Sequence, residues 1–351
     1  MTSRNEVSGL LQWRMRSQLL IEPAGTISAA VSRMLAVQSQ DLAAGRYAVA
    51  QRASKQCTRA EVDAEFNAGA IVRAWTMRGT LHICAAEDFH WLIAATRERT
   101  VAALASQRGK LGITATDSGR AEKIIGEHLQ EHGCASRSEL LRQLADHGVN
   151  VEAQRGYHLL MAAVLDGLMC LGPVPAASGL SAQNFVLADA WIKHPRTVAY
   201  PIQELVMRYL GGHAPASARD IAWYTGQTLT SIRQAIAQLG DQLAAAAHNE
   251  RGEELYAAAS QTELWEAQKQ HSLGQLPLRL LGPFDEYYLS YADRSPVADD
   301  AVRSQIGPGS NGMVKAFWLR QGRAAGPWNA DAAPTDRLGA ALHQRYLGFR
   351  T

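Results

Sequence analysis

The chain has 351 residues, of which 47% are hydrophobic and 19% charged, a composition typical of globular proteins and not of disordered or collagen-like chains. A chain of this length exceeds what one hydrophobic core usually organises, so we expect several structural modules. Its four cysteines are scattered without a CxxC pair, which indicates neither a disulfide framework nor a zinc ribbon. The most apolar stretch, 159–171, is interrupted by Asp166 and is shorter than the ~20 residues that span a bilayer, so we expect no membrane association.

The net charge of +2 is unevenly distributed along the chain. Residues 1–110 contain 14 Lys and Arg against 9 Asp and Glu, giving +5, whereas the rest of the chain is slightly acidic. This excess in the first third indicates a polyanionic partner. Arginine outnumbers lysine by 29 to 6, which suits forked contacts to phosphate. GC-rich coding, which the abundance of alanine also indicates, would produce the same bias.

The first helix pattern, residues 27–35, leads into the tetrapeptide Gln38-Ser39-Gln40-Asp41. On an ideal helix the two glutamines would point about 200° apart, so they can serve one site only where the helix ends or the chain extends. This position permits that. The simpler interpretation of the tetrapeptide alone is an ordinary polar helix end.

A helix-start pattern then recurs along the chain. A hydroxyl side chain followed three residues later by an acid predicts a capping box at Thr58, at Ser136 and, as a near variant, at Ser217. After Ser136 and after Ser217, the patterns indicate helix, turn, helix and hairpin. After Thr58 and one short helix, the chain instead goes directly into a predicted hairpin around Arg78-Gly79, with arms at 71–77 and 80–84.

Helix, turn, helix and hairpin, with one more helix in front, is the winged-helix arrangement. The leading helices are indicated at about 118–131 and 201–210. We therefore predict a mainly α fold with small β-hairpins, built from three tandem winged-helix units; a helical solenoid is the alternative, but known solenoid periods are shorter. The expected divisions are 1–110 (with the catalytic motif and wing hairpin), 111–195, 196–262 and a C-terminal segment, 263–351, with a further hairpin at 313–328.

Winged helices usually read DNA through the second helix, which presents basic or amide side chains to the major groove. Here the second unit offers Arg155 and His158, and the third offers Arg233 with two glutamines. We therefore expect these helices to act as scaffold rather than to read sequence. Arg78 at the hairpin turn is a better DNA element because it can reach a phosphate or the minor groove, although an exposed arginine in a turn is the plain alternative.

His128 and His132 match the HxxEH spacing of some metalloenzymes. The pentapeptide lies at a predicted helix end before Gly133, where histidines interact favourably with the helix dipole, and we prefer that interpretation to a metal site. No GxSxG, Walker loop or strand-turn-helix GxGxxG occurs, which removes the commonest hydrolase and nucleotide-binding interpretations.

Three segments occur in the order 34–41 (MLAVQSQD), 73–82 (RAWTMRGTLH) and 281–287 (LGPFDEY). Together they resemble the AlkZ/YcaQ-like family of winged-helix DNA glycosylases, and the resemblance spans most of the chain. It implies three tandem winged helices around a concave DNA-binding channel, with excision of alkylated bases and unhooking of interstrand crosslinks. The family's catalytic motif is two glutamines flanking an aliphatic residue, with aspartate as the second member in the YcaQ branch. Carried over, it identifies Gln38 and Gln40 as catalytic, with Ser39 at the aliphatic position.

Two neutral amides are suited to hydrolysing the N-glycosidic bond of an alkylated purine. An N7-alkylpurine already carries positive charge and leaves as a neutral base, so Gln38 and Gln40 need only hold a water beneath C1′. No metal or organic cofactor is required. Asp41 is close enough in sequence to support catalysis by stabilising the oxocarbenium ion or deprotonating water, but we favour a local capping or pairing role for it.

The expected partner is double-stranded DNA bearing alkylated bases or crosslinks. We expect a monomer in the bacterial cytoplasm, without membrane contact. A non-catalytic winged-helix DNA-binding or regulatory protein is the alternative from another class, although the poorly basic recognition helices argue against a sequence-specific regulator. The expected DNA contacts are Arg52, Arg73, Arg78, His82, Arg294 and Lys315.

Overall fold

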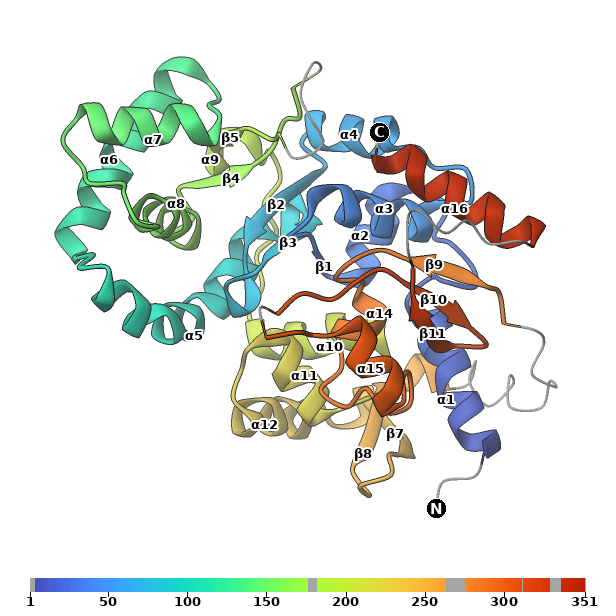
Figure 1. The fold of residues 1–351 in the computed structure, drawn as a ribbon. Coiled ribbons are helices and arrows are strands. Elements are labelled where there is room, and N and C mark those ends of the chain that lie inside the picture. The colour runs from blue at the N-terminus through green and yellow to red at the C-terminus, as the bar shows by residue number, and fades with distance from the viewer. Residues whose placement is uncertain (1–3, 176–181, 263–275, 311, 329–335, 351) are drawn as a thin grey trace. The chain divides into compact units, whose positions relative to one another are not determined.

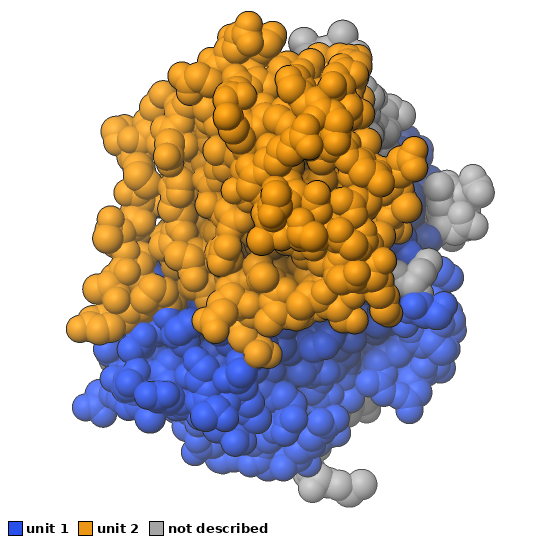
Figure 2. All heavy atoms as spheres, turned by 90° about the vertical axis from the view of Figure 1, so that its left-hand side faces the viewer, with its two compact units in different colours: residues 1–62, 202–351 blue, residues 63–201 orange. Residues whose placement is uncertain are grey.

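A computed structural model describes residues 4–175, 182–262, 276–310, 312–328 and 336–350 (Figure 1). Its internal contacts divide the chain into two compact units (Figure 2). Unit 1 comprises residues 1–62 and 202–351, and unit 2 comprises residues 63–201. The N-terminal segment and the C-terminal segment therefore belong to one unit, although unit 2 separates them in sequence. The architecture is mainly helical with small antiparallel sheets, as predicted.

Unit 1 contains most of the helices that the described residues form. They are α1 (Arg4–Ser17), α2 (Ile27–Met34), α3 (Leu42–Ala53), α10 (Pro201–His213, whose first residue is at the boundary), α11 (Ala218–Thr225), α12 (Leu229–Leu239), α14 (Glu286–Leu289), α15 (Asp300–Ile306) and α16 (Arg337–Arg350). Its strands are β1 (Val37–Gln38), β6 (Ala216–Ser217), β7 (Leu243–His248), β8 (Glu254–Ala258), β9 (Arg279–Leu281), β10 (Phe317–Arg320) and β11 (Arg323–Pro327).

Two three-stranded antiparallel sheets lie within unit 1, in the orders β6-β8-β7 and β11-β10-β9. The hairpin expected at 313–328 is present as β10 and β11, joined at Gln321-Gly322. Its inner face packs on α1, because Leu11 and Met15 share a buried cluster with Phe317 and Leu319. The N-terminal helix is thereby part of the core that holds the C-terminal segment.

Helix α4 (Arg59–Asn67) crosses the boundary into unit 2. Unit 2 then contains β2 (Ile71–Trp75), β3 (Leu81–Ala85), α5 (Phe89–Lys110), α6 (Ala115–His132), α7 (Arg137–Asp146), α8 (Arg155–Leu165), β4 (Met169–Leu171), β5 (Phe185–Leu187) and α9 (Ala188–Trp191). Strands β3, β2, β4 and β5 are neighbours in that order, and every pair is antiparallel. The hairpin predicted around Arg78-Gly79 is confirmed, with Ile71 opposite Ala85 and Trp75 opposite Leu81.

The three predicted capping boxes are confirmed. The side chains of Ser136 and Ser217 accept from the backbone N–H three residues on, and the acids there accept from the N-cap backbone in return. Thr58 makes the same reciprocal pair with Glu61, at 3.3 and 2.7 Å. A fourth box at Thr114 starts α6 a few residues earlier than the sequence pattern indicated.

The same order of elements occurs in two stretches of the chain. In residues 115–187, helices α6, α7 and α8 precede β4 and β5, and an isolated antiparallel bridge joins Ala135 to Phe185. In residues 201–258, helices α10, α11 and α12 precede β7 and β8, and β6 pairs with β8. The helix, turn, helix and hairpin order predicted for these stretches is therefore present in both.

Helix α5 was not predicted. It runs for 22 residues, and its buried positions lie between Phe89 and Thr100. Among the described residues, no helix combines the length and apolar character needed to cross a lipid bilayer.

Candidate functional site

The segment with the two glutamines follows the end of α2. The helix stops at Met34, and Val37–Gln38 is an extended strand followed by a bend at Gln40. Because the helix ends before Gln38, the two glutamines are not held about 200° apart, as they would be on a continuing helix. The backbone therefore meets the condition under which Gln38 and Gln40 can serve one site. Gln38 is 7% exposed and Gln40 is exposed, so the pair extends from the protein interior to its surface.

The turn out of α2 is strained. Leu35 has a φ of +63°, a region that leucine rarely adopts, and such residues persist where their surroundings hold them. Its N–H donates to the carbonyl of Ser32 at 3.2 Å. The next carbonyl, of Ala36, accepts from the Tyr224 hydroxyl of α11 at 2.7 Å. The strained turn and this hydrogen bond together direct the chain into the extended segment.

Gly212 of α10 lies directly against this turn. A Cβ at Gly212 would lie 2.6 Å from the carbonyl oxygen of Arg33 and 3.0 Å from Cα of Met34. Both neighbours are backbone atoms, which cannot move aside as a flexible side chain can. Only glycine allows α10 to approach the end of α2 so closely.

Glu286 at the start of α14 contacts the glutamine segment itself. One oxygen of its carboxylate accepts from the backbone N–H of Gln38 at 2.5 Å, and the other accepts from the Ser290 hydroxyl at 2.5 Å. The residue is 0% exposed. The contact joins positions 248 apart in the sequence, and so brings together the first and the last of the three segments that define the family resemblance.

Asp285, beside Glu286, anchors the same segment to α3. Its carboxylate forms a bidentate ion pair with the Arg52 guanidinium, with N–O distances of 2.8 and 3.0 Å, and both side chains are 0% exposed. Arg52 also donates to Gln18 at 3.0 Å. We had expected Arg52 to contact DNA, but it lies in the interior with Asp285, so its role in this structure is to hold the 281–287 segment. A long-range carboxylate partner could not be read from the sequence around Arg52.

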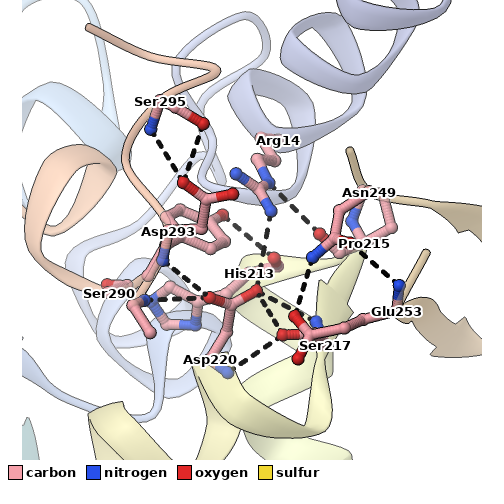
Figure 3. A network of polar contacts seen from close by, with 12 residues as sticks. Arg14, His213, Pro215, Ser217, Asp220, Asn249, Glu253, Ser290, Asp293 and Ser295 are labelled. Carbon is pink, nitrogen blue, oxygen red and sulfur yellow. Dashed lines mark hydrogen bonds and ion pairs between the residues drawn. The ribbon is translucent and has the colours of Figure 1, made fainter. Parts of the chain in front are cut away.

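A polar network fixes the chain beyond α14 (Figure 3). Asp220 of α11 accepts from the backbone N–H groups of Ala292 and Asp293 at 2.8 and 3.3 Å, and its other oxygen lies 3.8 Å from the Arg14 guanidinium. The Tyr209 hydroxyl donates to the carbonyl of Ser290 at 2.8 Å. With Asp285 held by Arg52, residues on both sides of Glu286 are fixed to other helices of unit 1.

Asp41 occupies the N-cap of α3. Its Oδ1 accepts from the backbone N–H of Ala44 at 3.1 Å. This is the usual N-cap contact, which satisfies one of the helix's otherwise unpartnered donors. The geometry thus agrees with the local role that we favoured for Asp41.

Three of the expected DNA contacts, Arg73, Arg78 and His82, lie in the β2–β3 hairpin of unit 2. His82 is 0% exposed, and burial, with a smaller contribution from the charge of Arg78, lowers its pKa to about 3. It is therefore a neutral interior histidine that contacts Thr76 at 2.9 Å, rather than a solvent-facing DNA contact. Arg73 is 7% exposed.

Arg78 is partly exposed in the turn between β2 and β3, with a φ of +57°. The adjoining Gly79 also has a positive φ, and a Cβ there would lie 2.9 Å from Cε of Met161 in α8. The hairpin turn therefore packs on the helices of unit 2. Arg78 is the residue of the hairpin that retains the position expected of a phosphate contact.

The two expected DNA contacts in the C-terminal segment lie in unit 1. Lys315 is exposed. Arg294 is half-buried, with its guanidinium 5.3 Å from the ring centre of Trp223 and 5.2 Å from that of Tyr288. Trp223 is 45% exposed and donates its indole N–H to the carbonyl of Leu289 at 3.0 Å. A cation held beside a partly exposed indole is suited to a nucleic acid, which offers both phosphates and base faces.

The candidate recognition helix of unit 2, α8, is not available to a DNA groove. Its residues from His158 to Leu165 are all buried, and Arg155 pairs with Asp117 at 3.4 Å. In α12, by contrast, Arg233 is exposed. The scaffold role expected of these helices therefore agrees with the burial of α8.

The two histidines of the HxxEH match lie in the last turns of α6. The rings of His128 and His132 stack with centroids 4.3 Å apart, and Nδ1 of His132 lies 3.0 Å from the carbonyl of His128. The helix ends at Gly133, as expected. Within the described parts of the chain, no group of three or more His, Cys, Asp or Glu has the arrangement of a metal site.

Sequence reasoning did not identify Glu286, Tyr224 or Gly212 as parts of the site. Glu286 lies in the segment 281–287, so the joint occurrence of that segment with 34–41 was a signal that the two meet. Nothing in the local sequence distinguishes Tyr224 or Gly212, because their contacts are made with α2 and the residues after it.

Comparison with known proteins agrees with these observations. Residues 31–343 match the model of a family described as DNA glycosylase AlkZ-like. The chain is 25% identical over 339 residues to an "Interstrand DNA cross-link repair glycosylase" of Streptomyces sahachiroi, covering 90% of this chain and 85% of that protein. It is also similar in fold to the solved structure of the Streptomyces sahachiroi DNA glycosylase AlkZ, with a TM-score of 0.78, 18% identity, and coverage of 98% of this chain and 96% of that one.

Proposed function

Because this chain belongs to the DNA glycosylase AlkZ-like family, whose enzymes hydrolyse N-glycosyl bonds, we propose that it excises N7-alkylated purines from double-stranded DNA and unhooks interstrand crosslinks. The observation that carries the proposal is the segment from Val37 to Gln40, which leaves α2 through a strained turn, is extended at Gln38 and is fixed at the Gln38 N–H by Glu286. The name of the Streptomyces sahachiroi relative supports the crosslink part of the proposal.

In the proposed mechanism, the amide oxygens of Gln38 and Gln40 hold one water beneath C1′ of the lesioned nucleotide. Most enzymes that cleave glycosidic bonds use one carboxylic acid to protonate the leaving group and one carboxylate to activate water or attack the sugar. Two amides can do neither. They can fix the position and lone-pair direction of the water, which lowers the barrier through proximity and fixed dipoles. The C1′–N bond breaks with its electron pair on the departing base, the water oxygen bonds to C1′, and the water's excess proton passes to the solvent.

The substrate class follows from the inability of two amides to protonate a leaving base. Alkylation at N7 places a positive charge on the purine, so the base departs as a neutral molecule without protonation by the enzyme. Bases that need acid catalysis would be poor substrates for such a site. Bulky adducts and crosslinks are too large for a tight extrusion pocket, so we propose that the enzyme reaches the sugar through an open cleft rather than by full base flipping.

DNA binding is proposed to involve residues of both units. The repeated element order in 115–187 and 201–258 supports the interpretation of these stretches as winged helices, the second and third of three around a concave channel. Arg78 of unit 2, with Arg294 and Lys315 of unit 1, are the proposed contacts, and the buried Arg73 is not among them. We propose that the protein acts as a monomer in the bacterial cytoplasm.

A direct test is release of N7-methylguanine from duplex DNA by the purified protein. We expect an abasic site to remain and the rate to be the same in EDTA, because amide positioning of water and a cationic leaving base require no Lewis acid. Replacing both glutamines by alanine should lower the rate by ~10² or more while leaving DNA affinity unchanged. A protein that binds DNA and releases no base would instead be a non-catalytic DNA-binding protein.

A further inference from the structure

We propose that Glu286 is a positioning residue for this reaction: its buried carboxylate holds the backbone N–H of Gln38 and thereby aims the Gln38 side chain. The inference rests on the proposed function and extends it to a residue 248 positions away from the glutamine. Glu286 itself does not touch the substrate in this account.

The geometry of the carboxylate supports a fixed contact. Each oxygen has its own donor, the N–H of Gln38 and the hydroxyl of Ser290, both at 2.5 Å, and the side chain has no exposed surface. Hydrogen bonds to an ionised acceptor are shorter and stronger than neutral ones. In a buried setting their loss is expensive, because the carboxylate would be left without its solvation.

The contact lies in the segment between α2 and α3, where the backbone has no α-helical hydrogen bonds. Past Met34 the backbone has left the α-helical hydrogen-bond ladder, and at Asp41 the next helix is capped. Between these points, the Ala36 carbonyl is held by Tyr224 and the Gln38 N–H by Glu286. Fixing the N–H of Gln38 fixes the peptide plane from which its Cα–Cβ bond projects, and hence the direction of the amide.

Glu286 is in turn anchored independently of the glutamines. Its own carbonyl accepts from Gln18 at 3.4 Å, and Gln18 also accepts from Arg52, which pairs with Asp285. Ser290, one turn further along, is held through its carbonyl by Tyr209. The carboxylate therefore acts from a rigid support, as a group that positions another must.

Two variants separate the hydrogen bond from the other consequences of a change at this site. In Glu286→Gln, the amide oxygen can still accept from the Gln38 N–H, and the amide nitrogen can donate to the Ser290 hydroxyl. In Glu286→Ala, neither bond can form. Ser136→Ala, which removes the cap of α7 in unit 2, is the control for a general loss of stability without a change near the glutamines.

The first measurement is hydrogen exchange at the Gln38 amide, which does not depend on catalysis. We expect the amide to be protected in the wild type and in Glu286→Gln, and to exchange at least about tenfold faster in Glu286→Ala, because the acceptor is gone. Ser136→Ala should leave its protection unchanged. Equal protection of Gln38 in the wild type and in Glu286→Ala would overturn the proposal.

The second measurement is single-turnover release of N7-methylguanine, with affinity for undamaged duplex measured on the same preparations. We expect Glu286→Ala to lose about tenfold or more in rate with unchanged affinity, since small misplacements of a positioning group have effects of that size. Glu286→Gln should recover most of the rate. A wild-type rate in Glu286→Ala, or a Glu286→Gln variant as slow as Glu286→Ala, would overturn the proposal.

Failure of the proposed function and failure of the Glu286 role give different results. If the wild type releases no base, the proposed function is wrong, and the positioning role falls with it even if the exchange results are as expected. If the wild type is active and Glu286→Ala is equally active, only the role of Glu286 is wrong.

Discussion

Gly212→Ala tests whether the close approach of α10 to the end of α2 sets the geometry of the glutamine segment. The added methyl would lie 2.6 Å from the Arg33 carbonyl oxygen and 3.0 Å from Cα of Met34. Replacing glycine by alanine within a helix ordinarily stabilises it by up to about 1 kcal/mol. Forcing an extra carbon into a packed contact costs roughly 1–3 kcal/mol. Since the obstructing atoms are backbone, we expect the steric term to win and the variant to be less stable than the wild type.

The adjacent Gly211 provides a matched control. It lies in the same helix, but its Cβ would come only within 4.0 Å of the Arg33 carbonyl oxygen, so Gly211→Ala gains helix propensity without a clash. Urea midpoints of the two variants should therefore move in opposite directions, downward for Gly212→Ala only. Its excision rate should fall as well, because the displaced turn lies directly before Gln38. A Gly212→Ala protein as stable as Gly211→Ala would refute the reasoning.

Three further predictions concern other parts of the chain. Asp41→Asn keeps a side-chain acceptor for the Ala44 N–H, so we expect single-turnover excision to stay near the wild-type rate and stability to fall by no more than about 1 kcal/mol; a large rate loss at unchanged melting temperature would make Asp41 catalytic. Burial, with a hydrogen bond to Asp166, raises the pKa of Glu122 to about 7, so the stability it contributes is present at low pH and is lost as pH rises through 7. Glu122→Gln should flatten this part of the stability profile measured by denaturation between pH 5 and pH 8, and an unchanged profile would contradict the assignment. Arg78→Ala should weaken binding to all duplex sequences alike and lower the salt dependence by about one phosphate contact in a titration, whereas sequence-selective loss would favour a regulator.

The features that were predictable from the sequence are those that depend on neighbours in the chain. The capping boxes at Ser136 and Ser217 are decided within four residues, and so is the hairpin turn at Arg78-Gly79. The local sequence pattern also allowed the helix α2 to end before Gln38. The hydrogen bonds of the capping boxes and of the hairpin turn are formed by residues close in sequence, whereas the path of the chain after α2 also depends on the distant Tyr224.

The features that were missed depend on contacts between distant segments. Arg52 was expected to contact DNA, but its pairing with Asp285, 233 positions away, and its hydrogen bond to Gln18 place it in the interior. His82 was treated as a DNA contact, but the packing of unit 2 encloses it and keeps it neutral. The hydrogen bond from the Gln38 N–H to Glu286 was missed for the same reason, since no local sequence pattern identifies which carboxylate accepts from which backbone N–H.

The central claim is that Gln38 and Gln40 act on one water, and a double-mutant cycle on single-turnover release of N7-methylguanine tests it most directly. If both amides hold the same water, removing either one already loses most of the positioning, so the double alanine variant should be little slower than the slower single variant. All four proteins should bind undamaged duplex equally. Losses that multiply would mean that the two glutamines act independently, and a double variant as fast as the wild type would mean that they do not carry the reaction.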